Sequence, residues 1–264
     1  ARGRRIESMP MTEIVSGRRA RIPYLCRELP NSTGNSAGNT RLEAVVYGSF
    51  EWIERDIETI NETNIVSRAL DDFMFDPRGL VDKAFEAILR NLERSGMRAN
   101  FVYVPNPHGV IYVDCHIEFQ GRLFSGMSCR FSLAETIERS FYEALSAVFI
   151  NVAGSRDDQS VRFVADAAVT QLMEPRGGPR RLRVSAKPRR TSLLKTLAAL
   201  EANLEAQGYD EIWVVDFSPP DVGLASVRVF VPGLELLRCG RTPMFAEKVA
   251  ATLDCIHRAR GTVF

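Results

Sequence analysis

The sequence has 264 residues, of which 45% are apolar, so it can form one large domain or two small ones around a hydrophobic core. Its 34 basic and 33 acidic residues leave a net charge of +1, which argues against general attraction to nucleic acid or to a membrane surface. No apolar run reaches the roughly 18 residues of a membrane helix, and the five scattered cysteines form no zinc pattern, so we expect a cytoplasmic protein with reduced thiols.

The first predicted helix follows a glycine-bearing loop. Residues 31–40 (NSTGNSAGNT) are predicted to be a loop, because Gly, Asn and Ser favour turns, and residues 41–59 to be a helix. Further along, the pattern predicts a helix over 78–94, strands over 100–105 and 110–118, a second glycine-bearing loop over 121–130 and a helix over 132–150.

The last third of the sequence starts with a basic stretch. Residues 176–190 hold seven Arg or Lys residues with Gly and Pro, which indicates a mobile surface segment that could also hold an acidic peptide or a phosphate. It is followed by a predicted helix over 192–207, strands over 211–217 and 225–231 and a helix over 243–259. Helices and strands do not alternate strictly, which favours an α+β fold in a single domain over residues 1–264.

Several carboxylates share one side of the helix predicted over 41–59. At 100° per residue, a single polar face includes Asn39, Glu43, Glu51, Glu54 and Arg55. The opposite arc is apolar, with Leu42, Val45, Val46, Phe50, Trp52, Ile53 and Ile57. The helix is therefore predicted to pack on a core by one side and to present acidic groups on the other.

Two interpretations of this polar face stay open from the residues alone. It could be a solvated surface with an ion pair between Glu51 and Arg55. Alternatively, it could hold Mg²⁺ through its carboxylates and a phosphate through Arg55, with Gly34 and Gly38 letting backbone amides approach an anion. The glycine loop matches neither a P-loop nor a Rossmann fingerprint.

A second glycine-bearing segment and helix repeat this arrangement. Gly126 and Ser128 precede the helix that carries Arg139 and Glu143, which are four residues apart and could form a surface ion pair. His116 alternates with apolar neighbours, so we interpret it as a structural histidine with satisfied hydrogen bonds.

Four sequence blocks together resemble the YcaO family. They are STGNSAGNTRLEAVVYGSFEWIERD from Ser32, GMSCRFSLAETIERSFYEALSA from Gly126, GSRDD from Gly154 and VVDFSPPDVGLASVRVFVPGLE from Val214. YcaO proteins are ATP-dependent enzymes that phosphorylate a peptide amide oxygen, after which a nucleophile attacks the carbon to give an azoline, a thioamide or an amidine. The resemblance implies a YcaO-like α+β domain acting on a ribosomally made peptide or a protein.

The resemblance also assigns residues. It places Asn39, Glu43, Glu51, Glu54 and Arg55 at the ATP and Mg²⁺ positions of the family, with Glu43, Glu51 and Glu54 as the metal ligands. Arg139 best matches a second arginine that contacts phosphate. No covalent catalytic residue is expected, because phosphoryl transfer depends on positioning and charge neutralisation.

Two departures from the family pattern modify these expectations. The earlier Ser and Glu pair of the family has no match before residue 31, where only Glu7, Glu13 and Glu28 are available, so the chain resembles the later part of the domain and could be inactive on its own. The alternative function is therefore a non-catalytic module that binds a peptide or a partner protein. The end of the sequence also lacks the proline-rich tail of azoline-forming members, which favours the thioamide-forming type with a TfuA-like or sulfur-delivering partner. A homodimer is a further expectation.

Overall fold

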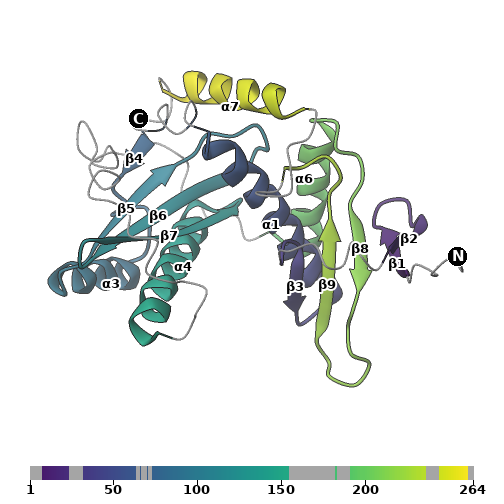
Figure 1. Ribbon diagram of the computed structural model, residues 1–264, viewed down its shortest axis with the longest axis horizontal. Helices are drawn as coiled ribbons and strands as arrows, with labels where there is room; N and C mark the ends of the chain where they lie inside the picture. Colours follow the sequence, from purple (N-terminus) through teal and green to yellow (C-terminus); the bar gives the residue numbers. More distant parts are fainter. Residues whose placement is uncertain are drawn as a thin grey trace, which may run out of the picture. The chain divides into compact units, whose positions relative to one another are not determined.

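Two antiparallel sheets organise the chain, each accompanied by its own helices (Figure 1). The computed structural model describes residues 8–23, 32–63, 66, 70, 73–154, 182, 191–235 and 244–260. The chain divides into two compact units: the first comprises Ala1–Thr59 and Arg190–Phe245, and the second comprises Ile60–Arg189 and Ala246–Phe264. The mixture of helices and antiparallel sheets confirms the predicted α+β class.

The sheet of the first unit has the strand order β2-β1-β8-β9-β3. Its strands are β1 (Ser8–Glu13), β2 (Arg19–Pro23), β3 (Asn35–Gly38), β8 (Trp213–Asp216) and β9 (Ala225–Phe230). Strands β8 and β9 lie within the strands predicted over 211–217 and 225–231, and they pair with each other antiparallel. The prediction that residues 31–40 are only a loop was wrong, because β3 lies inside this stretch and pairs with β9. Its Gly and Asn residues have little intrinsic strand preference, so this tertiary pairing determines the structure.

Helices α1 (Arg41–Asn61) and α6 (Leu193–Glu205) complete the first unit. Helix α1 begins where the sequence predicted, and its apolar arc is buried, with Ile53 fully inaccessible and Val45, Phe50 and Ile57 almost so. Ser192 caps α6 by accepting a hydrogen bond from the backbone of Lys195.

The sheet of the second unit has the order β4-β5-β6-β7. Its strands are β4 (Met74–Phe75), β5 (Arg98–Tyr103), β6 (Ile111–Phe119) and β7 (Arg122–Arg130). Strand β7 corrects the sequence prediction of a second glycine-bearing loop, since all nine of its residues pair with β6. Gly126 is paired with Cys115 in the middle of this ladder, so the glycine lies in a strand rather than in a turn.

The core of the second unit lies between this sheet and two helices, α3 (Lys83–Arg94) and α4 (Leu133–Ala153). Phe85 of α3 meets Phe141 of α4 edge to face, with ring centroids 5.1 Å apart. The helix predicted over 78–94 starts later than expected, because Asp82 caps α3 by accepting from the Phe85 backbone at 2.8 Å. The last helix of this unit is α7 (Phe245–Ala259).

Gly126 explains how closely α4 approaches β7. A Cβ atom at this position would overlap the backbone nitrogen of Ala144 and the carbonyl oxygen of Ser140. In the same turn of the helix, a carboxylate oxygen of Glu143 accepts a hydrogen bond from the backbone N–H of Met127 at 3.0 Å. Helix and strand are therefore joined by backbone packing and by a side-chain bond.

Some sequence predictions fall outside the described residues. These include the basic stretch 176–190, in which only Leu182 is described, and Glu7 and Glu28 near the start of the chain. Within the described part of the chain, no helix combines the length and apolar character needed to span a membrane.

Candidate functional site: the polar face of helix α1

The start of α1 is built by a reciprocal set of hydrogen bonds. The Thr40 hydroxyl accepts from the backbone of Glu43 at 3.1 Å, and Oε2 of Glu43 accepts from the backbone N–H of Asn39 at 2.8 Å and from its side-chain amide at 3.3 Å. This arrangement satisfies amides at the start of the helix that would otherwise have no partner. Asn39 and Glu43, which the sequence assigned to one site, are therefore brought together.

The glycines before α1 serve close packing. Gly34 has a φ of 79°, and a Cβ atom there would overlap the carbonyl oxygen of Val229 and the indole of Trp52. A Cβ atom at Gly38 would lie 3.0 Å from the backbone nitrogen of Ala44. The absence of a side chain at both glycines thus lets the segment before α1 pack closely on β9 and on the helix itself. This packing is a simpler explanation for the two glycines than contact with an anion.

The middle of the polar face is not a solvated surface. Glu54 is only 8% exposed, while Glu43, Glu51 and Arg55 are half-buried. Arg55 lies 2.7 Å from Glu58 and 3.8 Å from Glu54, so its guanidinium stands between two carboxylates. The solvated interpretation is therefore wrong for Glu54, whose carboxylate is buried. Burying a carboxylate is costly unless a charge or a hydrogen bond compensates it, and Arg55 supplies a nearby positive charge.

Sequence reasoning missed one cation beside this face. Arg228 of β9 is 3% exposed, its guanidinium lies over the ring of Phe230 at 5.3 Å, and its charge interacts with Glu51. Burial lowers the pKa of Arg228, and the negative charge of Glu51 acts in the opposite direction. A lone arginine inside an apolar strand, with Val227 and Val229 on either side, was the signal that could have identified it.

The donor set fits a magnesium nucleotide better than a bare metal. Among the described residues, no three His, Cys, Asp or Glu side chains are grouped closely enough to hold a metal ion together. Mg²⁺, however, is usually bound by one or two carboxylates, with phosphate oxygens and water as its other ligands. Glu43 makes its hydrogen bonds through Oε2, and Oε1 accepts none from the described residues. That oxygen has the hard character that Mg²⁺ prefers.

Arg139, the remaining predicted site residue, lies on α4 in the second unit. Its Nε lies 3.0 Å from Oε1 of Glu135, and the side chain is 44% exposed. Glu143, which the sequence considered as its ion-pair partner, bonds the backbone of Met127. Arg139 therefore shares an exposed pair at the start of α4.

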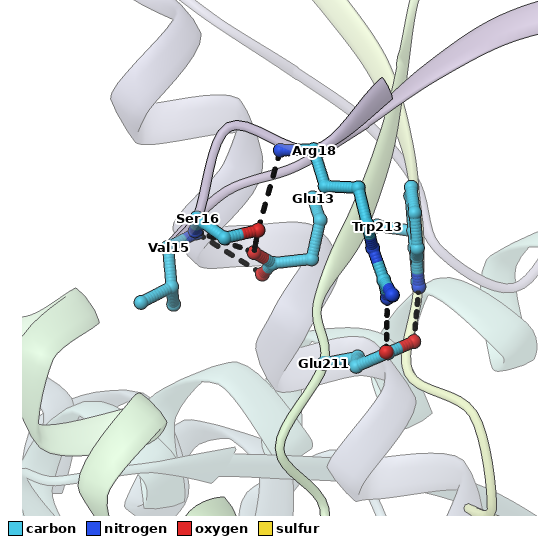
Figure 2. Close-up of polar contacts among 6 residues, drawn as sticks. All are labelled: Glu13, Val15, Ser16, Arg18, Glu211 and Trp213. Carbon is cyan, nitrogen blue, oxygen red and sulfur yellow. Dashed lines mark hydrogen bonds and ion pairs between the residues drawn. The ribbon is translucent and has the colours of Figure 1, made fainter. Parts of the chain in front are cut away.

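Glu13 is the last residue of β1, and its side chain holds the turn that leads to β2. Its carboxylate accepts from the backbone amides of Val15 and Ser16 at 3.0 and 2.6 Å and from the Ser16 hydroxyl at 2.6 Å (Figure 2). Burial opposes ionisation, but the hydrogen bonds from Ser16 and Val15 outweigh it, so the pKa of Glu13 is lowered. Glu13 therefore gives no sign of replacing the earlier acidic pair of the family.

A neighbouring cluster fastens this hairpin to the strand beside it. Arg18 pairs with Glu211 and lies over the ring of Trp213 at 4.9 Å, and the Trp213 indole donates to Glu211 at 2.7 Å (Figure 2). The bonds from Trp213 and Arg18 lower the pKa of Glu211. The cluster thus extends the β1–β8 pairing through side chains.

His116 differs from the satisfied histidine that the sequence suggested. It lies on β6 opposite Asn100 and Ser125, and its Nδ1 atom is inaccessible to solvent and has no hydrogen-bond partner among the described residues. Burial lowers the pKa of His116 to about 4, so the ring is neutral at physiological pH.

Comparison with known proteins identifies what this chain is similar to. Residues 1–235 match the profile of a family described as YcaO cyclodehydratase, binding ATP and Mg²⁺. An uncharacterised protein of the tfuA 3′ region of Rhizobium leguminosarum bv. trifolii is 27% identical over 222 residues, which are 78% of this chain and 53% of that protein. A protein of Methanothermobacter thermautotrophicus is 25% identical over 78% of this chain and 56% of its own length. The chain thus spans about half the length of these curated relatives.

Solved structures share the fold. A heterocyclase in complex with substrate and cofactor superposes with a TM-score of 0.69 at 21% identity, over 88% of this chain and 33% of that one. The YcaO protein of Methanopyrus kandleri, bound with AMPPCP and Mg²⁺, gives a TM-score of 0.68 at 20% identity, over 89% of this chain and 66% of that one.

Proposed function

The chain belongs to the YcaO family, and we propose that it forms part of the nucleotide site of an ATP- and Mg²⁺-dependent enzyme that modifies a peptide backbone. When bound, ATP would supply the phosphoryl group that activates a backbone amide oxygen, so that a nucleophile can attack the amide carbon. The task of the protein is then to bind, orient and neutralise charge.

The observation that carries this proposal is the buried carboxylate of Glu54 beside Arg55 on α1. In the proposal, Glu43, Glu51 and Glu54 each contribute to Mg²⁺ binding together with phosphate oxygens, and no single ion needs all three carboxylates. Asn39 contributes at the start of the helix, and Arg55 and Arg139 contact phosphate. Both arginines now pair with carboxylates, Arg55 with Glu58 and Arg139 with Glu135. A phosphate, with more charge than a carboxylate, would compete for these guanidinium groups.

The proposed product is a thioamide in a ribosomally made peptide or a protein, formed with a TfuA-like or sulfur-delivering partner. The Rhizobium relative from the tfuA 3′ region supports this choice. An azoline is the alternative product, since the family profile is described as a cyclodehydratase. We also propose a cytoplasmic location for the protein. The homodimer also remains part of the proposal.

Nucleotide binding tests the assignment of the site. Titration of the 264-residue chain with ATP, with and without Mg²⁺, should show metal-dependent binding that Glu51→Ala or Glu54→Ala weakens at least about tenfold, because each removes a charged ligand. Arg55→Ala and Arg139→Ala should weaken it by a similar factor.

Two matched variants serve as controls. Glu205→Ala removes an exposed helix glutamate from α6, and Arg90→Ala removes an exposed arginine from α3. Both should bind ATP within about twofold of the parent chain. Equal binding by the parent and the Glu54→Ala chain would contradict the site assignment.

A labelled peptide separates the products. If the amide oxygen of a substrate peptide carries heavy oxygen, turnover should transfer that label to inorganic phosphate, and the peptide mass should rise for a thioamide or fall by one water for an azoline. Tight peptide binding that ATP does not affect, without label transfer, would support the non-catalytic alternative.

A further inference from the structure

The side of α1 that faces away from Glu54 carries a row of three residues, Gly48, Trp52 and Asp56, which we call the rear stripe. They follow one another at intervals of four, so they lie along one line of the helix. Each contacts the chain segment that begins in β9 and ends just after it. The space in front of Gly48 is filled by Val229, whose Cγ2 would lie 2.6 Å from an added Cβ atom.

The other two members of the rear stripe make directional bonds to the same segment. The indole nitrogen of Trp52 donates to the carbonyl oxygen of Val229. One turn farther on, Oδ1 of Asp56 accepts from the backbone N–H of Glu235 at 2.6 Å. These two hydrogen bonds lie one turn apart along α1. A large rotation or translation of the helix would therefore break at least one of them.

Asp56 is the unusual member, because it is a carboxylate in the apolar arc of the helix. Its side chain is 0% exposed, and its neighbours on this side include Val45 and Ile53, which are 3% and 0% exposed. A buried carboxylate is unfavourable unless donors compensate it. The amide of Glu235 is such a donor, and Glu235 is itself 0% exposed.

Asp56 is the member of the rear stripe that lies far from the acidic residues of the polar face. At 100° per residue, Asp56 lies about 160° around the helix from Glu54 and about 140° from Glu51. Asp56 therefore cannot touch a ligand bound by these two carboxylates, but any rotation of α1 that it prevents would move them directly.

We propose that Asp56 is a positioning residue that, together with Trp52 and Gly48, fixes the rotation of α1 and so aims Glu51, Glu54 and Arg55 at the nucleotide. This inference rests on the proposed function, because it assumes that the polar face binds the nucleotide. The segment from Val229 to Glu235 then supplies the backbone groups that hold α1 in this orientation.

Nucleotide affinity provides the first test. Asp56→Ala removes the acceptor and should weaken Mg²⁺-dependent ATP binding at least about tenfold, whereas Asp56→Asn keeps an acceptor oxygen and should stay within about threefold of the parent. Ile57→Val serves as the control, because it shortens a neighbouring buried side chain and breaks no backbone bond. It should lower thermal stability but leave ATP affinity within about twofold.

A second readout does not depend on ATP. The chain has two tryptophans, so in a Trp213→Phe background the fluorescence reports Trp52 alone. Adding Asp56→Ala should shift the emission of Trp52 to longer wavelength and speed hydrogen exchange at the Glu235 amide, while adding Ile57→Val should change neither.

The two readouts separate the proposals. If the parent chain binds no ATP, the proposed function fails, and the Trp52 and Glu235 signals alone decide whether the stripe fixes the helix. If Asp56→Ala binds ATP like the parent, or leaves both signals unchanged while the chain is folded, the positioning role is overturned.

Discussion

The positive charge of Arg228 on β9 and the negative charge of Glu51 on α1 act on each other electrostatically, so a strand residue with almost no exposure offsets charge on the polar face. Glu51 is half-buried, and like charges stand near it along the helix. A fixed cation at this position lets several carboxylates coexist before any metal or nucleotide arrives.

Replacing Arg228 should therefore lower the stability of the fold and leave the polar face of α1 with more uncompensated negative charge. Arg228→Met keeps an unbranched stem but removes the guanidinium, which leaves Glu51 without this positive charge, and we expect the free energy of unfolding to fall by about 2 kcal/mol in urea titrations. The double variant Arg228→Met with Glu51→Gln should recover part of that loss. Additive losses would contradict a direct interaction between the two side chains.

Gly126 should not tolerate even a methyl group. Gly126→Ala would drive a Cβ atom into the backbone of Ser140 and Ala144, which cannot move without displacing α4, so we expect a loss of about 3 kcal/mol in unfolding free energy. Gly121→Ala is the matched control, since Gly121 has a φ of 70° but nothing within 4 Å of an added Cβ atom. Its cost should be backbone strain alone, about 1 kcal/mol. Equal losses for the two variants would contradict the packing explanation.

Acid should weaken the β1–β2 turn through Glu13. Its pKa is lower in the folded state than in the unfolded chain, so between these two values the unfolded chain binds more protons. The contribution of Glu13 is therefore complete above its unfolded pKa and is lost as pH falls through the folded value. Glu13→Gln should cost about 1–2 kcal/mol near neutral pH, because its amide group cannot accept from Ser16 and Val15 together. The difference between parent and variant should shrink as the pH falls below the ordinary value of 4.5 and through the lowered folded pKa; a constant difference would contradict the prediction.

His116 should also destabilise the fold in acid, over a pH range above the one in which Glu13 titrates. Its folded pKa of about 4 lies below the ordinary value of 6.5, so between these values the unfolded chain takes up a proton that the folded chain refuses. From pH 7.5 to 5 this costs about 2 kcal/mol. A His116→Phe chain, which cannot ionise there, should lose that much less stability over the same interval. Parallel pH profiles for the two chains would show that the ring titrates normally.

The helices were predictable from the sequence because each carries its own local signal. Helix α4 has Ser132 as its cap, and α1 has an apolar period that its burial confirms. Strands β3 and β7 were missed because Gly and Asn residues in them resemble turn residues. Only their partners, β9 and β6, make them strands, and pairing between distant segments leaves no local pattern.

The candidate site was also predictable only as far as its local sequence pattern allowed. The spacing of Glu51, Glu54 and Arg55 indicated a shared side of the helix, but periodicity does not reveal that this side is buried or that Arg55 stands between Glu54 and Glu58. Arg228 is 177 residues from Glu51 in the chain, and Asp56 is 179 residues from Glu235. Neither relationship has a spacing rule, because both depend on how β9 and the residues after it lie against α1.

The bond between Glu143 and the Met127 amide has a consequence for local opening of the fold. The carboxylate belongs to α4 and the amide to β7, so the bond joins the helix to the strand. If α4 lifts from the sheet, this hydrogen bond breaks and the amide loses its carboxylate acceptor. Hydrogen exchange at the Met127 amide would therefore follow the opening of α4.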